Sequence, residues 1–414
     1  MRAGDNKKLH TKGLQRIIIN IISTKPQEEL MHARLSHYLS SFVLILALAA
    51  TSSFAAIPTA PQLSAKSYIL MDYASGEVIA EKNSHDRVPP ASLTKLMTAH
   101  IVEQELAAGK IKLTDEVPIS EKAWKAEGSR MFVEVNKTVS VEELLKGVIV
   151  QSGNDASIAL AEYIAGTEAG FADLMNQEAQ RLGMQDSHFV NATGLPDDNQ
   201  YSSAYDMAIL ARTIIKESPS TYPMYKEKWF DYGGIRQPNR NRLLWWDESV
   251  DGLKTGHTES AGYCLVASAE KNGMRLISAV MGTDSDNTRT EESKQLMTYG
   301  FRFFTSKEIY PANTVLAQQR IWKGQAKEVN IGLIEPLQLV VPADQGEDME
   351  AVITLNKVIE APVTEGQTLG TLQVMSGNTV LVEKPLVALQ TVDRAGWFGR
   401  LWDSILLFFH NLLN

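Results

Sequence analysis

The stretch Pro90-Ala91-Ser92-Leu93-Thr94-Lys95-Leu96-Met97 places a hydroxyl and an amine three residues apart within a run of helix-forming residues. Residues at i and i+3 are neighbours on a helix surface, so Ser92 and Lys95 are expected on one face and the apolar residues on the other. Such a pair is ordinarily a helix cap and a solvated surface charge. A lysine buried beside the serine would instead lose its proton and could activate the hydroxyl for attack on a carbonyl. The second interpretation requires further polar groups elsewhere in the chain.

Two other short motifs follow this stretch. Ser152-Gly153-Asn154 comes directly after an apolar run, and Lys254-Thr255-Gly256 opens a predicted strand. Taken singly, the first would be a loop cap before a helix and the second an exposed strand start. In this order, on a helix, an inter-helix loop and a strand, the three motifs form the signature of serine enzymes that recognise penicillin.

The chain resembles the low-molecular-mass penicillin-binding proteins, the D-alanyl-D-alanine carboxypeptidases of the type-5 group. The resemblance covers nearly all of the expected mature chain and extends beyond the three motifs to residues 89–98, 147–156, 191–195 and 250–258. It also includes a C-terminal β-domain and a terminal amphipathic helix.

The resemblance implies a role for each motif residue. Ser92 would attack the carbonyl between the two terminal D-alanines of a peptidoglycan pentapeptide stem, with Lys95 as general base and Ser152 as proton relay to the leaving amine. β-Lactams would acylate the same serine as covalent inhibitors. The residues expected to bind the substrate are Asn154, Lys254, Thr255, Gly256 and His257, the last through its backbone N–H in an oxyanion hole shared with Ser92. Arg289 would either help Thr255 to hold the terminal carboxylate or be a surface charge at a helix start.

The body of the chain has predicted strands at both ends of a helical region. Alternating β-rich residues predict strands at 67–73, 78–80, 252–255, 262–269 and 274–281, and apolar periodicity predicts helices at 141–150, 156–165, 171–182, 204–216 and 290–303. This order implies an α/β sandwich in residues 56–305, an antiparallel sheet flanked by helices with an inserted helical lobe. Residues 306–391, with short alternating runs between Gly, Pro and Asn, predict a small all-β sandwich.

The two ends of the chain predict export and membrane attachment. Residues 31–55 have the pattern of a secretory signal peptide, and residues 1–30 are expected to come from an upstream start codon and to be absent from the mature protein. In residues 392–414 apolar side chains recur at helical spacing, which predicts an amphipathic helix lying in the membrane interface. A helix docked on the protein's own body is the alternative. Together the two segments predict a peripheral protein on the periplasmic side of the cytoplasmic membrane.

The composition excludes several classes of protein. The chain of 414 residues has a net charge of −9, which argues against a nucleic-acid partner. Its one cysteine, Cys264, cannot form an intrachain disulfide and is expected to be buried and inert. The eight histidines have no metal-binding spacing, so no metal or other cofactor is expected.

Three other functions remain to be weighed against the carboxypeptidase. A β-lactamase and a D,D-endopeptidase would use the same nucleophile, and a catalytically silent wall-binding scaffold would not need the intact motifs. Two features favour the carboxypeptidase over a class A β-lactamase. The second motif is Ser-Gly-Asn at residues 152–154, and the sequence has no clear equivalent of the carboxylate that activates the deacylating water in those β-lactamases. The balance of carboxypeptidase and endopeptidase activities and the oligomeric state stay open.

Overall fold

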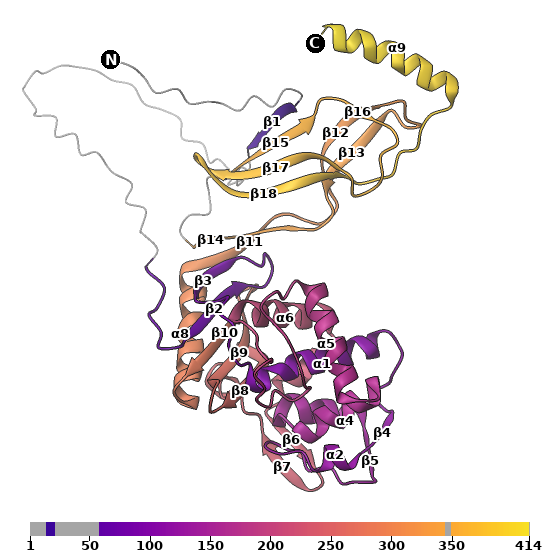
Figure 1. Cartoon of the computed structure of the whole chain (residues 1–414). Helices are drawn as coiled ribbons and strands as arrows, with labels where there is room; N and C mark the ends of the chain where they lie inside the picture. The colour runs from indigo at the N-terminus through magenta and orange to yellow at the C-terminus, as the bar shows by residue number, and fades with distance from the viewer. Residues whose placement is uncertain (1–13, 21–57, 344–348, 414) are drawn as a thin grey trace, which may run out of the picture. The chain divides into compact units, whose positions relative to one another are not determined.

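The computed structural model describes residues 14–20, 58–343 and 349–413 (Figure 1). Contacts divide the described residues into two compact units, one of residues 58–306 and one that begins at residue 307 and includes the strand at residues 14–20. The predicted signal peptide, residues 31–55, lies outside the described residues, as does the predicted upstream segment except for one strand.

A five-stranded antiparallel sheet runs through the first unit in the order β3-β2-β10-β9-β8. Its strands are β2 (Ser67–Asp72), β3 (Val78–Lys82), β8 (Val250–Thr258), β9 (Gly262–Lys271) and β10 (Met274–Thr283). β2 pairs with β10 from the other end of the unit, with Tyr68 opposite Val280. Helix α8 (Asp286–Phe303) covers one face and α6 (Ala204–Glu217) lies against the other (Figure 1). The predicted α/β sandwich is confirmed.

The regular structure between β3 and β8 is mainly helical. They are η1 (Ala91–Leu93), α1 (Thr94–Ala107), α2 (Glu121–Trp124), α3 (Val141–Lys146), the π-helix η2 (Gly147–Gln151), α4 (Asn154–Ala165), α5 (Glu168–Leu182), α6, η3 (Tyr222–Lys226) and α7 (Leu243–Trp246). Polar caps define several starts, among them the capping box of Ser140 and Glu143 before α3. This confirms the predicted helical lobe.

Two small two-stranded antiparallel sheets in this region were not predicted. They are formed by β4 (Glu116–Pro118) with β5 (Thr138–Ser140) and by β6 (Trp229–Tyr232) with β7 (Ile235–Pro238). The second pair is a hairpin whose turn is Gly233-Gly234, and both glycines have positive φ. A Gly-Gly pair between β-rich residues is a hairpin signal, so this element could have been predicted.

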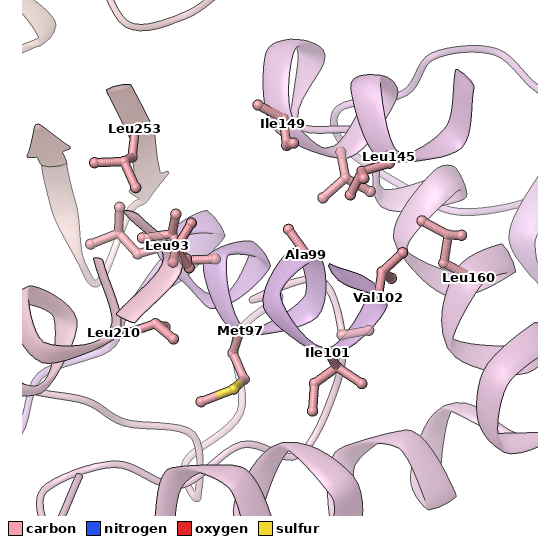
Figure 2. Packing of buried hydrophobic residues seen from close by; sticks show 14 of the residues in the cluster. Leu93, Met97, Ala99, Ile101, Val102, Leu145, Ile149, Leu160, Leu210 and Leu253 are labelled. Carbon is pink, nitrogen blue, oxygen red and sulfur yellow. The ribbon is translucent and has the colours of Figure 1, made fainter. Parts of the chain in front are cut away.

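Helix α1 lies at the centre of the first unit. All residues from Thr94 to Glu103 are buried, because α4, α5, α6 and β8 contact the helix from different sides. Figure 2 shows Met97 and Ile101 of α1 among apolar side chains of the lobe and the sheet. Polar side chains of α1 are buried as well, and some of them bond internally; Thr98, for example, donates to the carbonyl oxygen of Ala192 at 2.7 Å. The two predicted faces of this helix are therefore both buried.

The second unit is built from strands, as predicted. One sheet has the order β1-β15-β17-β18-β13-β12-β16, and β11 pairs with β14 separately. The strands are β1 (Leu14–Asn20), β11 (Phe304–Tyr310), β12 (Thr314–Trp322), β13 (Glu328–Leu333), β14 (Leu337–Pro342), β15 (Met349–Asn356), β16 (Ile359–Glu360), β17 (Thr368–Ser376) and β18 (Thr379–Ala388). Alternate residues of β14 are buried in one apolar core, which is the period expected of a strand with one covered face. β1, which was not predicted, pairs with β15 along its whole length.

A helix ends the chain where an amphipathic helix was predicted. In α9 (Trp397–Leu413) most of the large apolar side chains are exposed, namely Trp397, Phe398, Leu401, Trp402, Ile405, Phe408, Phe409 and Leu412. The carboxylate of Asp403 accepts the backbone N–H of Lys323 at 2.6 Å, so a polar side of the helix faces the β-domain. Within the described residues, no helix combines the length and the apolar character needed to cross a membrane.

Candidate active site

Ser92 lies in the short 3-10 helix η1, directly before α1, and not inside the α-helix that was predicted. Two glycines allow other segments to approach this turn. A Cβ on Gly194 would lie 1.8 Å from the carbonyl oxygen of Ala91, and a Cβ on Gly256 of β8 would lie 3.0 Å from that of Pro90. Because neither glycine has a side chain, a loop and a strand can both contact the turn that presents Ser92.

Lys95 occupies the first turn of α1 and faces Ser92. Its Nζ lies 3.0 Å from Ser92 Oγ and 2.5 Å from the carbonyl oxygen of Thr193. Burial, together with the positive charge of Arg240, lowers the pKa of Lys95 to about 7. The amine is therefore neutral in a substantial fraction of molecules near neutral pH and can accept a proton. The interpretation of Lys95 as a solvated surface charge is wrong.

The second motif places another serine beside another lysine. Ser152 follows the π-helix η2 and has a left-handed backbone with φ of +65°. Its Oγ accepts a hydrogen bond from Lys254 Nζ at 2.9 Å. Gly153 precedes α4, and no side chain caps that helix, so the interpretation of Ser152 as a loop cap is wrong. A non-glycine residue in this conformation is typical of functional sites.

Lys254 is held inside the protein by β8. Its Nζ also donates to the carbonyl oxygen of Thr255 at 3.0 Å. Burial, with the positive charges of Lys95, Arg240 and Arg289, lowers the pKa of Lys254 well below its usual value. The motif lies in the second half of β8, which begins at Val250, and does not open the strand as predicted. An exposed strand start is therefore excluded for these residues.

The second motif and Asp155 also hold the loop of residues 127–133 through hydrogen bonds. The backbone N–H of Asn154 donates to Ser129 at 2.7 Å, and its Nδ2 donates to the carbonyl oxygen of Glu127 at 2.6 Å. Asn154 Oδ1 is buried without a hydrogen-bond partner among the described residues. Asp155 accepts the backbone N–H groups of residues 131–133 at distances of 3.0, 2.8 and 3.2 Å. This clamping role of Asp155 was missed, although the residue directly follows the motif.

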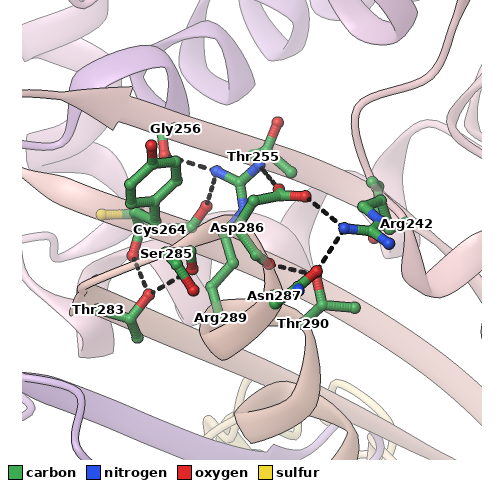
Figure 3. A network of polar contacts seen from close by, with 12 residues as sticks. Arg242, Thr255, Gly256, Cys264, Thr283, Ser285, Asp286, Asn287, Arg289 and Thr290 are labelled. Atoms are coloured by element: carbon green, nitrogen blue, oxygen red, sulfur yellow. Dashed lines mark hydrogen bonds and ion pairs between the residues drawn. The ribbon is translucent and has the colours of Figure 1, made fainter.

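Arg289 is buried near the start of α8, so the alternative of a surface charge is wrong. Its Nη1 donates to the carbonyl oxygens of Gly256 at 2.9 Å and Cys264 at 3.3 Å, and its Nη2 binds the Asp286 carboxylate (Figure 3). Arg289 thereby links the third motif on β8 to the neighbouring strand and to α8. Cys264 is buried as expected, and burial raises the pKa of its thiol to about 11.

Arg240, like Asp155, is a residue of the site that sequence reasoning did not identify. It lies on the surface between Asn239 and Asn241, both buried, and Asn241 Nδ2 donates to the carbonyl oxygen of Gly252 at 2.9 Å. Its positive charge lowers the pKa of Lys95 in the first motif and of Lys254 in the third. No local pattern distinguishes Arg240 from other surface arginines, because its position depends on the loop that those asparagines hold.

Thr255 of the third motif and the following His257 lie at the same end of β8. Thr255 is buried, and the exposed His257 ring stacks on Tyr263 with centroids 3.9 Å apart. Two serine–lysine pairs thus lie within a cluster of positive charge, an arrangement suited to nucleophilic attack and to an anionic substrate. Among the residues that the structure describes, no group of His, Cys, Asp or Glu side chains is arranged to hold a metal ion.

Both units match known protein families. Residues 54–285 match the family described as D-alanyl-D-alanine carboxypeptidase, and residues 304–394 match the penicillin-binding protein 5 C-terminal domain. The D-alanyl-D-alanine carboxypeptidase DacC of Escherichia coli strain K12 is 44% identical, over 88% of this chain and 94% of the relative. DacA of the same strain is 43% identical, over 86% of this chain and 90% of the relative.

Solved structures show the same similarity. Penicillin binding protein 5 from Haemophilus influenzae has a TM-score of 0.78 and 41% identity, covering 81% of this chain and all of that chain. Penicillin-binding protein D2 from Listeria monocytogenes, in the ampicillin-bound form, has a TM-score of 0.54 and 30% identity over 58% of this chain and 100% of its own. The chain belongs to the D-alanyl-D-alanine carboxypeptidase family of serine-type peptidases.

Proposed function

We propose that Ser92 removes the terminal D-alanine from peptidoglycan pentapeptide stems through an acyl-enzyme. The observation that supports this most strongly is the 3.0 Å contact between Lys95 Nζ and Ser92 Oγ, with the pKa of Lys95 lowered to about 7. The neutral amine takes the hydroxyl proton as Oγ bonds to the carbonyl carbon between the two D-alanines. The C–N bond then breaks and D-alanine leaves. Water cleaves the resulting ester, which returns a proton to Ser92 and frees the shortened stem.

Ser152 is the proposed proton relay. The leaving nitrogen needs a proton as the C–N bond breaks, and the Ser152 hydroxyl can donate its own proton while it accepts one from Lys254, 2.9 Å away. The lowered pKa of Lys254 makes that donation easier, because a buried ammonium among other cations releases its proton readily.

The substrate's terminal carboxylate suits the cluster of cations. Thr255 would bind this carboxylate, and Arg240 and Arg289 would supply positive potential, Arg289 from behind the strand because its guanidinium already binds the Gly256 and Cys264 carbonyl oxygens. The backbone N–H groups of Ser92 and His257 would form the oxyanion hole. Asn154, whose Oδ1 is buried and free of protein hydrogen bonds among the described residues, would bind the stem's amide.

β-Lactams would acylate the same serine. Penicillin-binding protein D2 from Listeria monocytogenes is similar to this chain and has been solved in ampicillin-bound and cefotaxime-bound forms, which supports this assignment. A β-lactamase would release the drug rapidly, whereas a carboxypeptidase would stay acylated. If the protein hydrolysed a chromogenic cephalosporin in steady state faster than it released D-alanine from a pentapeptide, it would be assigned as a β-lactamase instead.

We also propose attachment to the outer face of the cytoplasmic membrane, after cleavage of the signal peptide near Ala55. The exposed apolar side chains of α9 support this, since a helix with one apolar face and one polar face suits the lipid interface. Deletion of residues 393–414 should move the protein into the soluble fraction. Continued membrane association of the truncated protein would contradict this attachment. A separate measurement, the intact mass of the processed protein, tests the absence of residues 1–30, and a mature N-terminus before Met31 would contradict it.

The catalytic proposal is tested by comparing two serine variants. Ser92→Ala should abolish both covalent penicillin labelling and D-alanine release, because no nucleophile remains. Ser152→Ala keeps the nucleophile and should label slowly, with D-alanine release reduced. Labelling or D-alanine release by folded Ser92→Ala would refute the assignment, as would complete inactivity of the wild-type protein, which is the result expected of a wall-binding scaffold.

A further inference from the structure

Exposed aromatic side chains gather on the segment that leads from β6 to β8. Trp229, Trp245 and Trp246 are 44%, 40% and 36% exposed. The rings of Trp229 and Trp245 meet edge to face with centroids 6.3 Å apart, so they form one surface. Single exposed apolar residues are ordinary, but a cluster of large ones indicates an interaction site.

Each of these tryptophans has a cation over its ring. The pairs, with the distance from the cation to the ring centroid, are Arg236 over Trp229 at 4.8 Å, Arg242 over Trp246 at 5.2 Å and Lys228 over Trp245 at 5.9 Å. We call these six residues the tryptophan patch. The cations help to orient the rings and add positive charge beside them. Residues 228–246 contain four basic residues and one acidic residue, although the chain as a whole is acidic.

Contacts connect the tryptophan patch with residues that support the catalytic groups. Arg242 lies 3.1 Å from Asp286, which also binds Arg289, the residue that holds the third motif (Figure 3). Arg240, two residues before Arg242, is close enough for its charge to lower the pKa of Lys95. Strands β6 and β7 also contact η2, the helix that precedes the second motif. A long substrate bound at the serine–lysine pairs could therefore extend over the patch.

We propose that the tryptophan patch binds the glycan chain of peptidoglycan while Ser92 acts on an attached stem. This inference rests on the proposed function, which supplies a substrate whose stems are attached to a sugar polymer. The face of an indole is electron-rich and attracts the weakly positive C–H groups of a sugar ring. The surrounding cations complement the carboxylates of the stems.

A lipid surface is the other ligand that tryptophans with basic neighbours can suit. The position of the tryptophan patch favours the glycan. A bilayer against these rings would cover the segment that contains Arg240 and restrict the approach to the catalytic groups. A glycan chain in the same place would instead bring its own stem toward Ser92.

The test compares two substrates with the full-length protein. One is a soluble pentapeptide stem without sugar, and the other is polymeric peptidoglycan that carries pentapeptide stems. The double variant Trp229→Ala/Trp245→Ala should lose about tenfold in kcat/KM on the polymer and keep the wild-type value on the soluble stem. Trp229→Phe/Trp245→Phe retains two aromatic rings and should recover most of the loss. Trp124→Ala, which removes a 42% exposed tryptophan from α2 outside the patch, should leave both values unchanged.

Three results would overturn the inference. The first is a kcat/KM of the double variant on the polymer that equals the wild-type value, and the second is an equal loss of kcat/KM on both substrates. The third is a double variant that binds anionic phospholipid vesicles less tightly than the wild type but keeps its kcat/KM on the polymer. Sedimentation with glycan strands freed of their stems tests the tryptophan patch without catalysis, and the double variant should sediment less than the wild type. If the wild-type protein released no D-alanine from the soluble stem, the proposed function would fail, while this sedimentation would still decide whether the patch binds glycan.

Discussion

Gly194→Ala tests how Ser92, the proposed nucleophile, is positioned. Gly194 has φ of +81°, and a Cβ there would lie 1.8 Å from the carbonyl oxygen of Ala91, the residue before Ser92. Ordinary contact begins at 3.4 Å, so the turn would have to move by about 1.6 Å. A displacement of about 1 Å in a catalytic group can reduce a rate by about 10². Gly194→Ala should therefore slow acylation of Ser92 by at least about 100-fold.

Gly166→Ala is the matched control. Gly166 ends α4 with φ of +73°, but nothing lies within 4 Å of its Cβ position. Both substitutions impose a left-handed conformation on alanine, at roughly 1–2 kcal/mol, and only the one at Gly194 creates the collision. The assay is the second-order rate of labelling by a fluorescent penicillin, with thermal unfolding measured in parallel. A folded Gly194→Ala variant that labels at the rate of Gly166→Ala would refute the proposed positioning of the turn.

Three further predictions concern protonation and the loop clamp. The acylation rate should rise with pH through the Lys95 pKa of about 7, because only the neutral amine accepts a proton. Arg240→Gln removes a charge that lowers this pKa and should therefore move the midpoint of the pH–rate profile upward. A flat profile from about pH 5 to 9 would contradict the role of Lys95 as general base. Burial raises the pKa of Glu103 to about 7, so the folded state keeps a proton that the unfolded state has released, and stability falls as pH rises from about 4.5 to 7. Glu103→Gln should remove this pH-dependent loss of folding stability, which is on the order of 3 kcal/mol. Urea titrations of the wild type and the variant at about pH 5 and pH 8 measure it, and the same pH dependence in both would exclude a contribution from Glu103. Asp155→Ala leaves three backbone N–H groups without their acceptor. The variant should therefore lose about 3 kcal/mol or more in free energy of unfolding and should be acylated more slowly. Unchanged stability in chemical denaturation would argue that Asp155 does not hold the loop.

Local patterns were sufficient for much of the fold and for the first half of the site. The contact between Ser92 and Lys95 follows from their i, i+3 spacing, which remains close even though Ser92 lies in a 3-10 turn. The strands that pair in the central sheet were visible as β-rich runs, and their position at both ends of the first unit predicted that they share one antiparallel sheet, as β2 and β10 do. The terminal amphipathic helix was equally visible as a helical repeat of aromatic residues.

Other features depend on contacts between distant parts of the chain. Lys254 and Ser152 are separated by 102 positions, and the hydrogen bond between them forms only because β8 lies beside the end of η2. Arg289 resembles any arginine at a helix start, yet packing of α8 on the sheet buries it against the third motif. Likewise, both faces of α1 are buried because the sheet and the lobe enclose it, which its own sequence does not indicate.

The central claim is that Ser92 forms the acyl-enzyme, and the most direct measurement is mass spectrometry of the protein after brief exposure to a β-lactam, followed by proteolysis and peptide mapping. With a penicillin as the β-lactam, the proposed mechanism predicts a single adduct on the peptide that contains Ser92, equal in mass to the intact drug because the ring opens without loss of atoms. The same adduct should be absent from folded Ser92→Ala. An adduct on any other residue, or none in a wild-type protein that still releases D-alanine, would contradict the mechanism.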